Sequence, residues 1–161
     1  MIKFLHKNKG FSIIEVVVAS AIVLLIGTGF TGALSQTIAL SENALHIGQA
    51  TSLLEEGAEA VKSIRDDSWT TISGLTVGTT YYLSFNNTTK KWALSTTANT
   101  IDSMYTRTVV VSAVNRSSTD DIASTGTVDA STKKVTINVS FNGRTGQVTK
   151  TLSLYISDIF N

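Results

Sequence analysis

Cysteine and proline are both absent from the 161 residues. Without cysteine the chain forms no disulfide, no thiolate metal site and no cysteine nucleophile. Without proline, no residue of that type forces a kink in a helix. Charged residues are scarce as well, at 16%, whereas an ordinary soluble domain has about a quarter. The scarcity is local, because no charged residue lies between Glu15 and Glu42.

Basic charge is concentrated at the N-terminus. The chain has 13 Lys and Arg residues against 12 Asp and Glu, and Lys3, Lys7 and Lys9 lie among the first ten residues. Without residues 1–10, ten basic and twelve acidic residues remain, a net charge of −2. The body of the protein therefore has no broad basic surface, and we expect no nucleic-acid partner by default.

A long apolar run follows the basic segment. Residues 11–40 contain a single charge, that of Glu15. As a helix this run would be about 45 Å long at about 1.5 Å per residue, and a bilayer core requires only about 20 apolar residues. The run predicts a membrane-spanning helix, with the preceding lysines in the cytoplasm and the C-terminal part outside.

Glu15 is the unusual residue of this run. A charge within an apolar span costs roughly 2.5–3.5 kcal/mol on insertion scales, so such a residue is a functional candidate by default. Its position alone is equally compatible with a carboxylate that lies near the lipid headgroups.

The residues around Glu15 favour a functional role. The stretch Gly10-Phe11-Ser12-Ile13-Ile14-Glu15, with Lys7 and Lys9 before it and the apolar run behind it, resembles the processing site of type IV prepilins and pseudopilins. The resemblance implies that a prepilin peptidase cuts after Gly10 and methylates the new amino terminus at Phe11. It also implies that Glu15 neutralises the amine of a neighbouring subunit during filament assembly.

Two other interpretations of the N-terminus explain fewer of its residues. A secretory signal peptide has an apolar core of about 7–15 residues and then a small-x-small cleavage site, but here Ala19-Ser20-Ala21 lies in the middle of the run. A plain single-span anchor leaves Glu15 unexplained.

The GxGxxG pattern at residues 27–32 requires a preceding strand for dinucleotide binding, so we interpret it as part of the helix.

From Ser41 to about Asp67 the sequence becomes amphipathic. The charged residues Glu42, Glu55, Glu56, Glu59 and Lys62 mostly take the face opposite an apolar stripe, and Glu59 and Lys62 are spaced for a weak ion pair. The whole helix is predicted to run from about Ser12 to about Arg65. The stripe that should pack on the following domain consists of Ile47, Ala50, Leu54, Ala58, Val61 and Ile64.

Alternating apolar and polar residues after Asp67 predict antiparallel strands. We expect a sheet of about four to six strands against the amphipathic face, with turns at Asn86-Asn87 and Asn142-Gly143 and a final strand at about 147–157. The polar segment 115–134 is predicted to be a loop. Its acids, Asp120, Asp121 and Asp129, are candidates for calcium, but they lack EF-hand spacing and favour a solvated turn.

The predicted fold class is thus α+β and pilin-like, with one long N-terminal helix whose second half packs on a C-terminal antiparallel β-sheet. The predicted organisation is a leader peptide at 1–10, a transmembrane or filament-core helix at 11–40, the amphipathic half at 41–67 and a β-rich head at 68–161. A Tyr-x-Arg-Thr-Val-Val-Val strand starting at Tyr105 resembles minor pilins rather than disulfide-closed major pilins.

The resemblance implies a structural subunit, a minor pilin or pseudopilin, of a type IV pilus-like or type II secretion-like filament. Implied partners are other pilin subunits, the prepilin peptidase, and an inner-membrane assembly platform with its ATPase. The chain would be a single-pass cytoplasmic membrane protein before assembly and part of an extracellular or periplasmic filament afterwards. We expect no enzyme activity, catalytic residue, metal or cofactor.

Two alternatives remain. One is a tip-located binding module for adhesion or DNA uptake, in which a Lys90-Lys91 or Lys133-Lys134 patch acts locally. The other is a simple membrane-anchored β-domain.

Overall fold

Helix α1 spans Ile13–Asp67 in the computed structural model, which describes residues 10–144 and 146–159. Its ends lie within two residues of the predicted ones, so the long helix is confirmed. The Ser12 carbonyl accepts the backbone N–H groups of Glu15 and Val16 at 3.0 and 3.2 Å and thereby starts the helix. Most of the predicted leader, including Lys7 and Lys9, lies outside the described residues.

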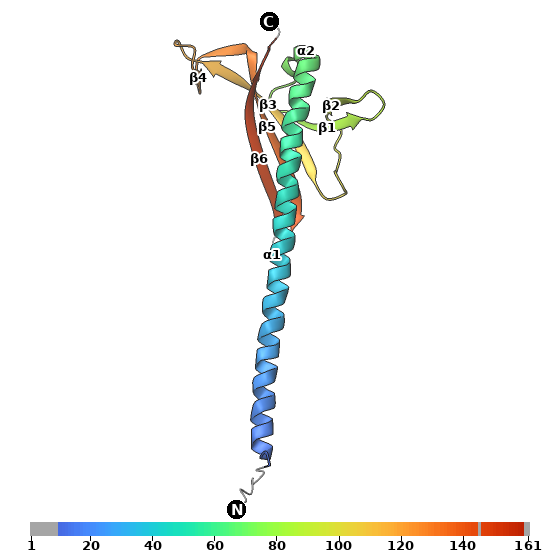
Figure 1. Ribbon diagram of the computed structural model, residues 1–161. Helices are drawn as coiled ribbons and strands as arrows, with labels where there is room; N and C mark the ends of the chain where they lie inside the picture. The colour runs from blue at the N-terminus through green and yellow to red at the C-terminus, as the bar shows by residue number, and fades with distance from the viewer. Residues whose placement is uncertain (1–9, 145, 160–161) are drawn as a thin grey trace, which may run out of the picture. The chain divides into compact units, whose positions relative to one another are not determined.

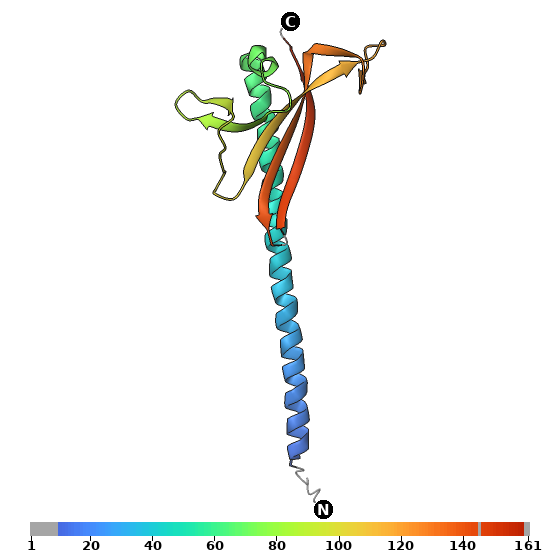
Figure 2. The ribbon, with the colours of Figure 1, turned by 180° about the vertical axis from the view of Figure 1, so that it is seen from behind.

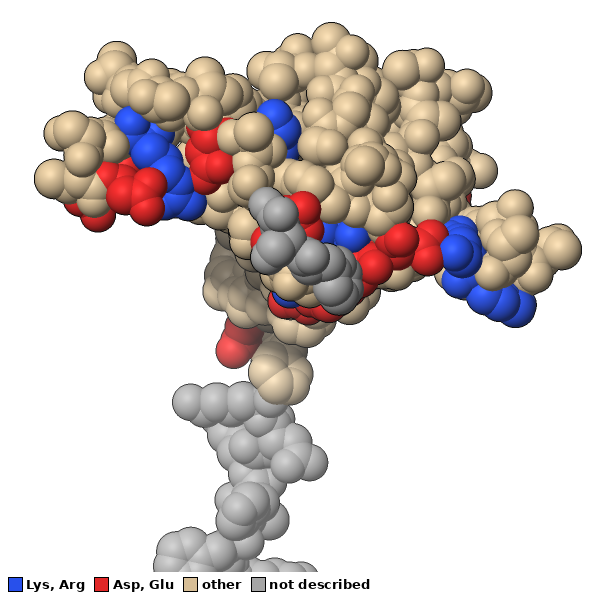
Figure 3. Space-filling view, turned by 90° about the horizontal axis from the view of Figure 1, so that it is seen from above, with Lys and Arg blue, Asp and Glu red and all other residues tan. Residues whose placement is uncertain are grey.

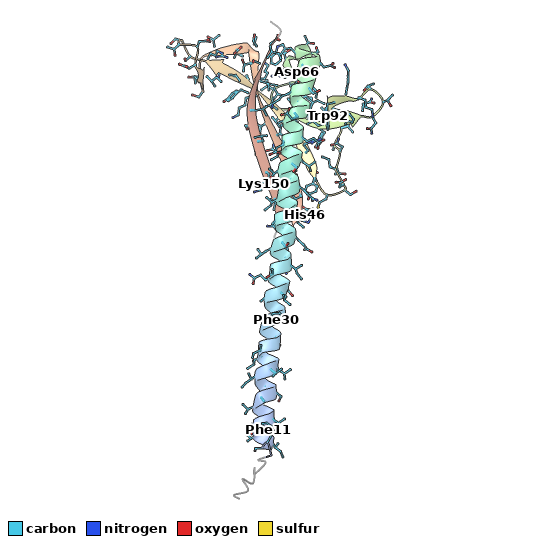
Figure 4. All side chains as sticks on the ribbon, in the orientation of Figure 1. Phe11, Phe30, His46, Asp66, Trp92 and Lys150 are labelled. Atoms are coloured by element: carbon cyan, nitrogen blue, oxygen red, sulfur yellow. The ribbon has the colours of Figure 1, made fainter. Side chains whose placement is uncertain are left out.

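The chain divides into two compact units, residues 1–42 and 43–161. In the described part of the first unit, the large apolar side chains of α1 are exposed all around the helix; Ile13 is 85% and Leu25 73% exposed. Figure 4 shows such side chains projecting from several sides of the helix around the labelled Phe30. A helix that is apolar all round is normally buried in a core or a membrane.

The second unit contains the rest of α1, the short helix α2 and a six-stranded antiparallel sheet. Its strand order is β2-β1-β3-β5-β6, and β4 pairs with β3 beside this path (Figures 1 and 2). The α+β fold class is therefore confirmed, as is the expected number of strands. The elements after α1 are α2 (Trp69–Ser73), β1 (Thr80–Asn86), β2 (Lys91–Ser95), β3 (Thr106–Arg116), β4 (Ile122–Ala123), β5 (Thr127–Gly143) and β6 (Gly146–Ser157).

The core of the second unit lies between one face of the sheet and the amphipathic part of α1. Successive strand residues point to opposite faces, and on β3 and β5 the buried ones alternate with partly exposed ones. The predicted helix stripe is buried except for the half-buried Ile47, and Gly57 and Ala60 widen it. The fully buried members on the two central strands are Val109, Val111, Val135, Ile137 and Val139.

The segment 115–134 differs from its prediction, because it is not one loop. Strand β3 continues to Arg116, and β5 begins at Thr127. The pairing shifts from Ala113–Lys133 to Val114–Asp129, so that three residues of β5 bulge out. Such a bulge breaks the two-residue alternation on which strand prediction depends.

The last hairpin turn lies later in the chain than Asn142-Gly143, where the sequence predicts it. Asn142 and Gly143 belong to β5, where Asn142 pairs with Gln147 and Gly143 pairs with Gly146. The chain therefore turns between Gly143 and Gly146, and Gly146 has a φ of +128° that favours glycine. The predicted final strand is confirmed as β6.

Gly126 closes the short connection between β4 and β5. Its φ is +141°, and a Cβ atom there would lie 2.1 Å from the carbonyl oxygen of Arg116. Only glycine permits this approach. At Gly126 the connection between β4 and β5 therefore contacts the backbone at the end of β3. Strand β4 pairs with one edge of β3 there, and β5 pairs with the other edge.

Candidate functional site

The candidate processing site lies at the start of α1. Gly10, Phe11 and Ser12 precede the first helical residue, and Phe11 is 83% exposed. Gly10 is exposed, and an ideal Cβ built on it meets nothing within 4 Å. A glycine has no side chain that would keep a protease from approaching the peptide bond closely.

Glu15 lies in the first turn of α1 and is exposed. An acidic residue in this turn interacts favourably with the partial positive charge at the N-terminus of a helix. Its carboxylate makes no ion pair with any of the residues that the structure describes. The Glu15 carboxylate is therefore unpaired within the part of the chain that the structure describes.

The helix around Glu15 is long and apolar enough to cross a membrane by its length and composition. Its glycines and hydroxyl residues do not interrupt it. Gly27, Gly29 and Gly32 are all helical, which confirms that the GxGxxG pattern does not follow a strand. Thr31 donates to the Gly27 and Thr28 carbonyls, and Ser35 donates to the Thr31 carbonyl, so these polar groups are satisfied within the helix.

Arg107 links the sheet to the helix, which sequence reasoning missed. Its side chain is buried, with 3% exposed, and Nη1 donates to the Leu53 carbonyl at 3.0 Å. The Glu56 carboxylate lies 3.3 Å from Nη1, and the guanidinium lies over the Trp92 ring at 5.2 Å. Arg107 is two residues from the buried Val109 on β3 and two residues from the buried Tyr105 before it, so all three side chains point to the same face. This two-residue spacing is the sequence signal that could have indicated an inward-facing arginine.

A second polar cluster ties the helix to Tyr105, the residue directly before β3. The hydroxyl of the buried Tyr105 donates to Gln49 Oε1, and His46 Nδ1 donates to the same hydroxyl oxygen at 2.9 Å. Burial first, and then the nearby Asp102 carboxylate, raise the pKa of the Tyr105 phenol, which keeps it a neutral donor. Phe141 packs edge-on against Tyr105 with ring centroids 5.5 Å apart.

The three acids of segment 115–134 do not converge on a metal site. Arg116 Nε donates to Asp129 Oδ2 at 2.6 Å and lies 3.6 Å from Asp120 Oδ1, while Thr119 donates to Asp121. The hydrogen bond from Arg116 and then that from Thr132 lower the pKa of Asp129 to about 2. In the described part of the chain, no group of three His, Cys, Asp or Glu residues could hold a metal ion.

The two lysine pairs do not form continuous patches. Lys91 binds the Asp67 carboxylate at 2.6 Å. Lys133 and Lys134 are consecutive on β5 and point to opposite faces of the sheet. Figure 3, which views one end of the molecule, shows blue and red atoms next to one another, with tan residues covering most of the remaining surface. These lysines therefore do not combine into a basic surface.

Comparison with known proteins gives one result. The family profile described as "Prokaryotic N-terminal methylation motif" matches residues 5–31, which include Gly10, Phe11 and Glu15. No curated protein and no solved structure matches the chain significantly. The matched motif and the long apolar helix together support membrane anchoring and point to a structural protein rather than an enzyme.

Proposed function

We propose that this chain, a type IV prepilin-like protein, is a minor pilin or pseudopilin that is cut after Gly10 and assembles into a filament through α1. The filament would be of the type IV pilus or type II secretion kind. In this proposal residues 1–10 are the leader, residues 11–40 form the membrane or filament-core segment, and residues 68–161 are the head.

The spacing between Gly10, Phe11 and Glu15 carries the proposal. Cleavage after Gly10 would create a cationic amine on Phe11, at the end of an apolar helix. An isolated charge in apolar surroundings is costly, and pairing with an opposite charge offsets much of that cost. The Glu15 carboxylate, which has no ion-pair partner among the described residues, would supply the opposite charge to the amine of a neighbouring subunit.

The exposed apolar surface of the first unit supports the same conclusion. Side chains such as Ile14, Leu24 and Phe30 are each more than 60% exposed in the isolated chain. Apolar area left in water costs about 25 cal/mol per Å². The membrane would cover this surface before assembly, and the equivalent helices of other subunits would cover it afterwards.

Partners and location follow from the same proposal. Prepilin peptidase would cut and methylate the chain, and an inner-membrane platform with its ATPase would move it into the filament. Lys3, Lys7 and Lys9 would hold the N-terminus in the cytoplasm before cleavage, according to the positive-inside rule. The head would then lie outside the membrane.

Replacing Gly10 with leucine tests the processing step. We expect the Gly10→Leu variant to remain at its precursor mass in cells that contain the peptidase, because the side chain would keep the protease from approaching the peptide bond. Intact-mass measurement distinguishes a chain that begins at Met1 from one that begins at a methylated Phe11.

Gly48→Leu is the matched control, since Gly48 is an exposed helical glycine with nothing within 4 Å of a built Cβ. The control should be processed as the original chain is. Complete processing of Gly10→Leu, or an original chain that still begins at Met1, would contradict the proposal.

A further inference from the structure

A shallow groove lies on the face of the sheet that points away from α1. Ser112 pairs with Lys134, and Lys134 pairs with Tyr155, so these three side chains stand side by side across β3, β5 and β6. Residues of β4 form the opposite rim, where Asn115 Nδ2 donates to the Ser124 carbonyl at 3.2 Å. The cavity has a volume of about 280 Å³.

The groove contains an available cation. Lys134 makes no ion pair with any residue in the described ranges 10–144 and 146–159. No acidic residue lines the groove, and the Asp129 carboxylate, earlier on the same strand β5, is bound by Arg116 at 2.6 Å. A lysine without a partner, in a concave site, is available to bind an anion from outside the protein.

The groove also contains an exposed aromatic ring. Tyr155 is 51% exposed, and Ile122 across the groove is 47% exposed. The other outward positions of β6 hold only small hydroxyl residues and one amide. Tyr155 is therefore the one aromatic side chain in its row, and its ring offers a flat apolar surface with a polar end.

A neutral, hydroxyl-rich surface continues from the groove along the sheet. Thr136 and Ser153 hydrogen-bond across β5 and β6 at 3.1 Å, and Thr151 donates to Asn138 at 2.7 Å. Lys134 is the single charge among the outward-facing residues of β3, β5 and β6 in this area. These outward-facing residues are Thr106, Thr108, Val110 and Ser112 on β3, Lys134, Thr136, Asn138, Ser140 and Asn142 on β5, and Gln147, Thr149, Thr151, Ser153, Tyr155 and Ser157 on β6.

We propose that this groove binds an acidic polysaccharide, with one sugar ring stacked on Tyr155, its carboxylate on the Lys134 ammonium, and further hydroxyl groups along β5 and β6. A sugar polymer matches a surface that is polar but almost uncharged. A nucleic acid would need several cations along its backbone, and an apolar peptide would need a larger apolar area than Ile122, Val110 and the Tyr155 ring supply. A single ammonium, without the arginines or backbone N–H nests typical of phosphate sites, suits a carboxylate.

Titration of the full chain in neutral detergent micelles with an oligogalacturonate tests the proposal. Lys134→Gln should weaken binding about fivefold, the loss expected for a partly exposed ion pair. Tyr155→Ser, which places there the residue type of its neighbours in β6, should weaken binding about tenfold through the lost stacking surface. The methyl-esterified oligomer, which keeps the sugar rings but loses the charge, should bind as weakly to the original chain as the acidic oligomer binds to Lys134→Gln.

Lys133→Gln is the matched control, because Lys133 is the next residue on β5 and points to the other face. Unchanged melting temperatures would show that the variants are folded. The proposal is overturned if Lys133→Gln weakens binding as much as Lys134→Gln, if neither groove variant weakens it, if the ester binds as well as the acid, or if inorganic polyphosphate binds equally tightly. Because the assay needs no cleavage or assembly, its outcome is independent of the proposed filament role.

Discussion

Asp129 shows how the second unit stabilises a single charge. Arg116 donates to its Oδ2 at 2.6 Å, and the backbone N–H of Ser131 donates to its Oδ1 at 2.8 Å. These groups stabilise the carboxylate over the carboxylic acid, so its pKa falls from 3.8 to about 2 in the folded chain. The sequence identified this residue as acidic and turn-associated, but only the fold shows that an arginine 13 residues away is its partner.

The lowered pKa of Asp129 predicts a dependence of stability on pH. Because the pKa of Asp129 is lower in the folded chain than in the unfolded chain, its ionised carboxylate stabilises the fold. This stabilisation is fully present at pH values above the unfolded pKa of 3.8, and it disappears as the pH falls to about 2. The contribution is at most about 2 kcal/mol after allowance for solvent screening. Urea unfolding between pH 7 and pH 2 should show this loss in the original chain and less of it in Asp129→Asn.

Asp120→Asn provides the control for this experiment. The Asp120 carboxylate is 86% exposed and lies 3.6 Å from Arg116, so its removal should leave the pH profile nearly unchanged. A profile for Asp129→Asn that keeps the full acid-dependent loss would show that other carboxylates are responsible.

At the scale of elements, α1 and the sheet approach closely where Gly57 faces β3 and β5. A Cβ built on Gly57 would lie 3.1 Å from Arg107 Cδ and 3.2 Å from Ile137 Cγ2, both closer than ordinary contact. Because residue 57 has no side chain, the helix can lie near Arg107, and the Leu53 carbonyl can accept a hydrogen bond from the Arg107 guanidinium.

Enlarging Gly57 should consequently separate α1 from the sheet. Gly57→Leu should lower the free energy of unfolding by about 2 kcal/mol, because overpacking outweighs the better helix propensity. Gly48→Leu should raise it slightly, since the same propensity gain there meets no neighbour. Thermal or urea unfolding of the two variants measures the difference, and equal effects at both glycines would show that the helix does not pack as described.

Periodicity predicted the elements of this chain well where one face is buried. The stripe from Ala50 to Ile64 and the alternation in β5 and β6 each have one dominant apolar face, so pattern and structure agree. The pattern failed at the bulge of β5, where three extra residues shift the register, and at Asn142-Gly143, whose turn signal lies inside a strand. The order β2-β1-β3-β5-β6 depends on contacts between distant segments, which periodicity does not encode.

The candidate sites were predictable to different degrees. The Gly10, Phe11 and Glu15 spacing is local, so it was visible in the sequence itself. Arg107 and the His46–Tyr105–Gln49 cluster depend on contacts more than 50 residues apart along the chain. The groove beside Lys134 depends on the pairing of β3, β4, β5 and β6, which no local pattern indicates.

At the scale of the whole molecule, the two units present contrasting surfaces. The described part of the first unit exposes apolar side chains all around its helix, whereas the second unit has its own buried core. A chain with this composition needs an apolar environment for one unit and water for the other. Assembly through the first unit would satisfy that need, and it leaves Glu15, the one charged side chain of residues 11–40, to be compensated there.

Incorporation of a Glu15→Gln variant into filaments tests whether Glu15 pairs with a neighbouring amine. The variant should still be cut to begin at Phe11, but its recovery in sheared filaments should fall at least about tenfold, because an unpaired amine in apolar surroundings costs more than about 1.4 kcal/mol. Glu42→Gln, at the first charge beyond the apolar segment, should assemble as the original chain does. Normal incorporation of Glu15→Gln would contradict the pairing of Glu15 with a neighbouring amine.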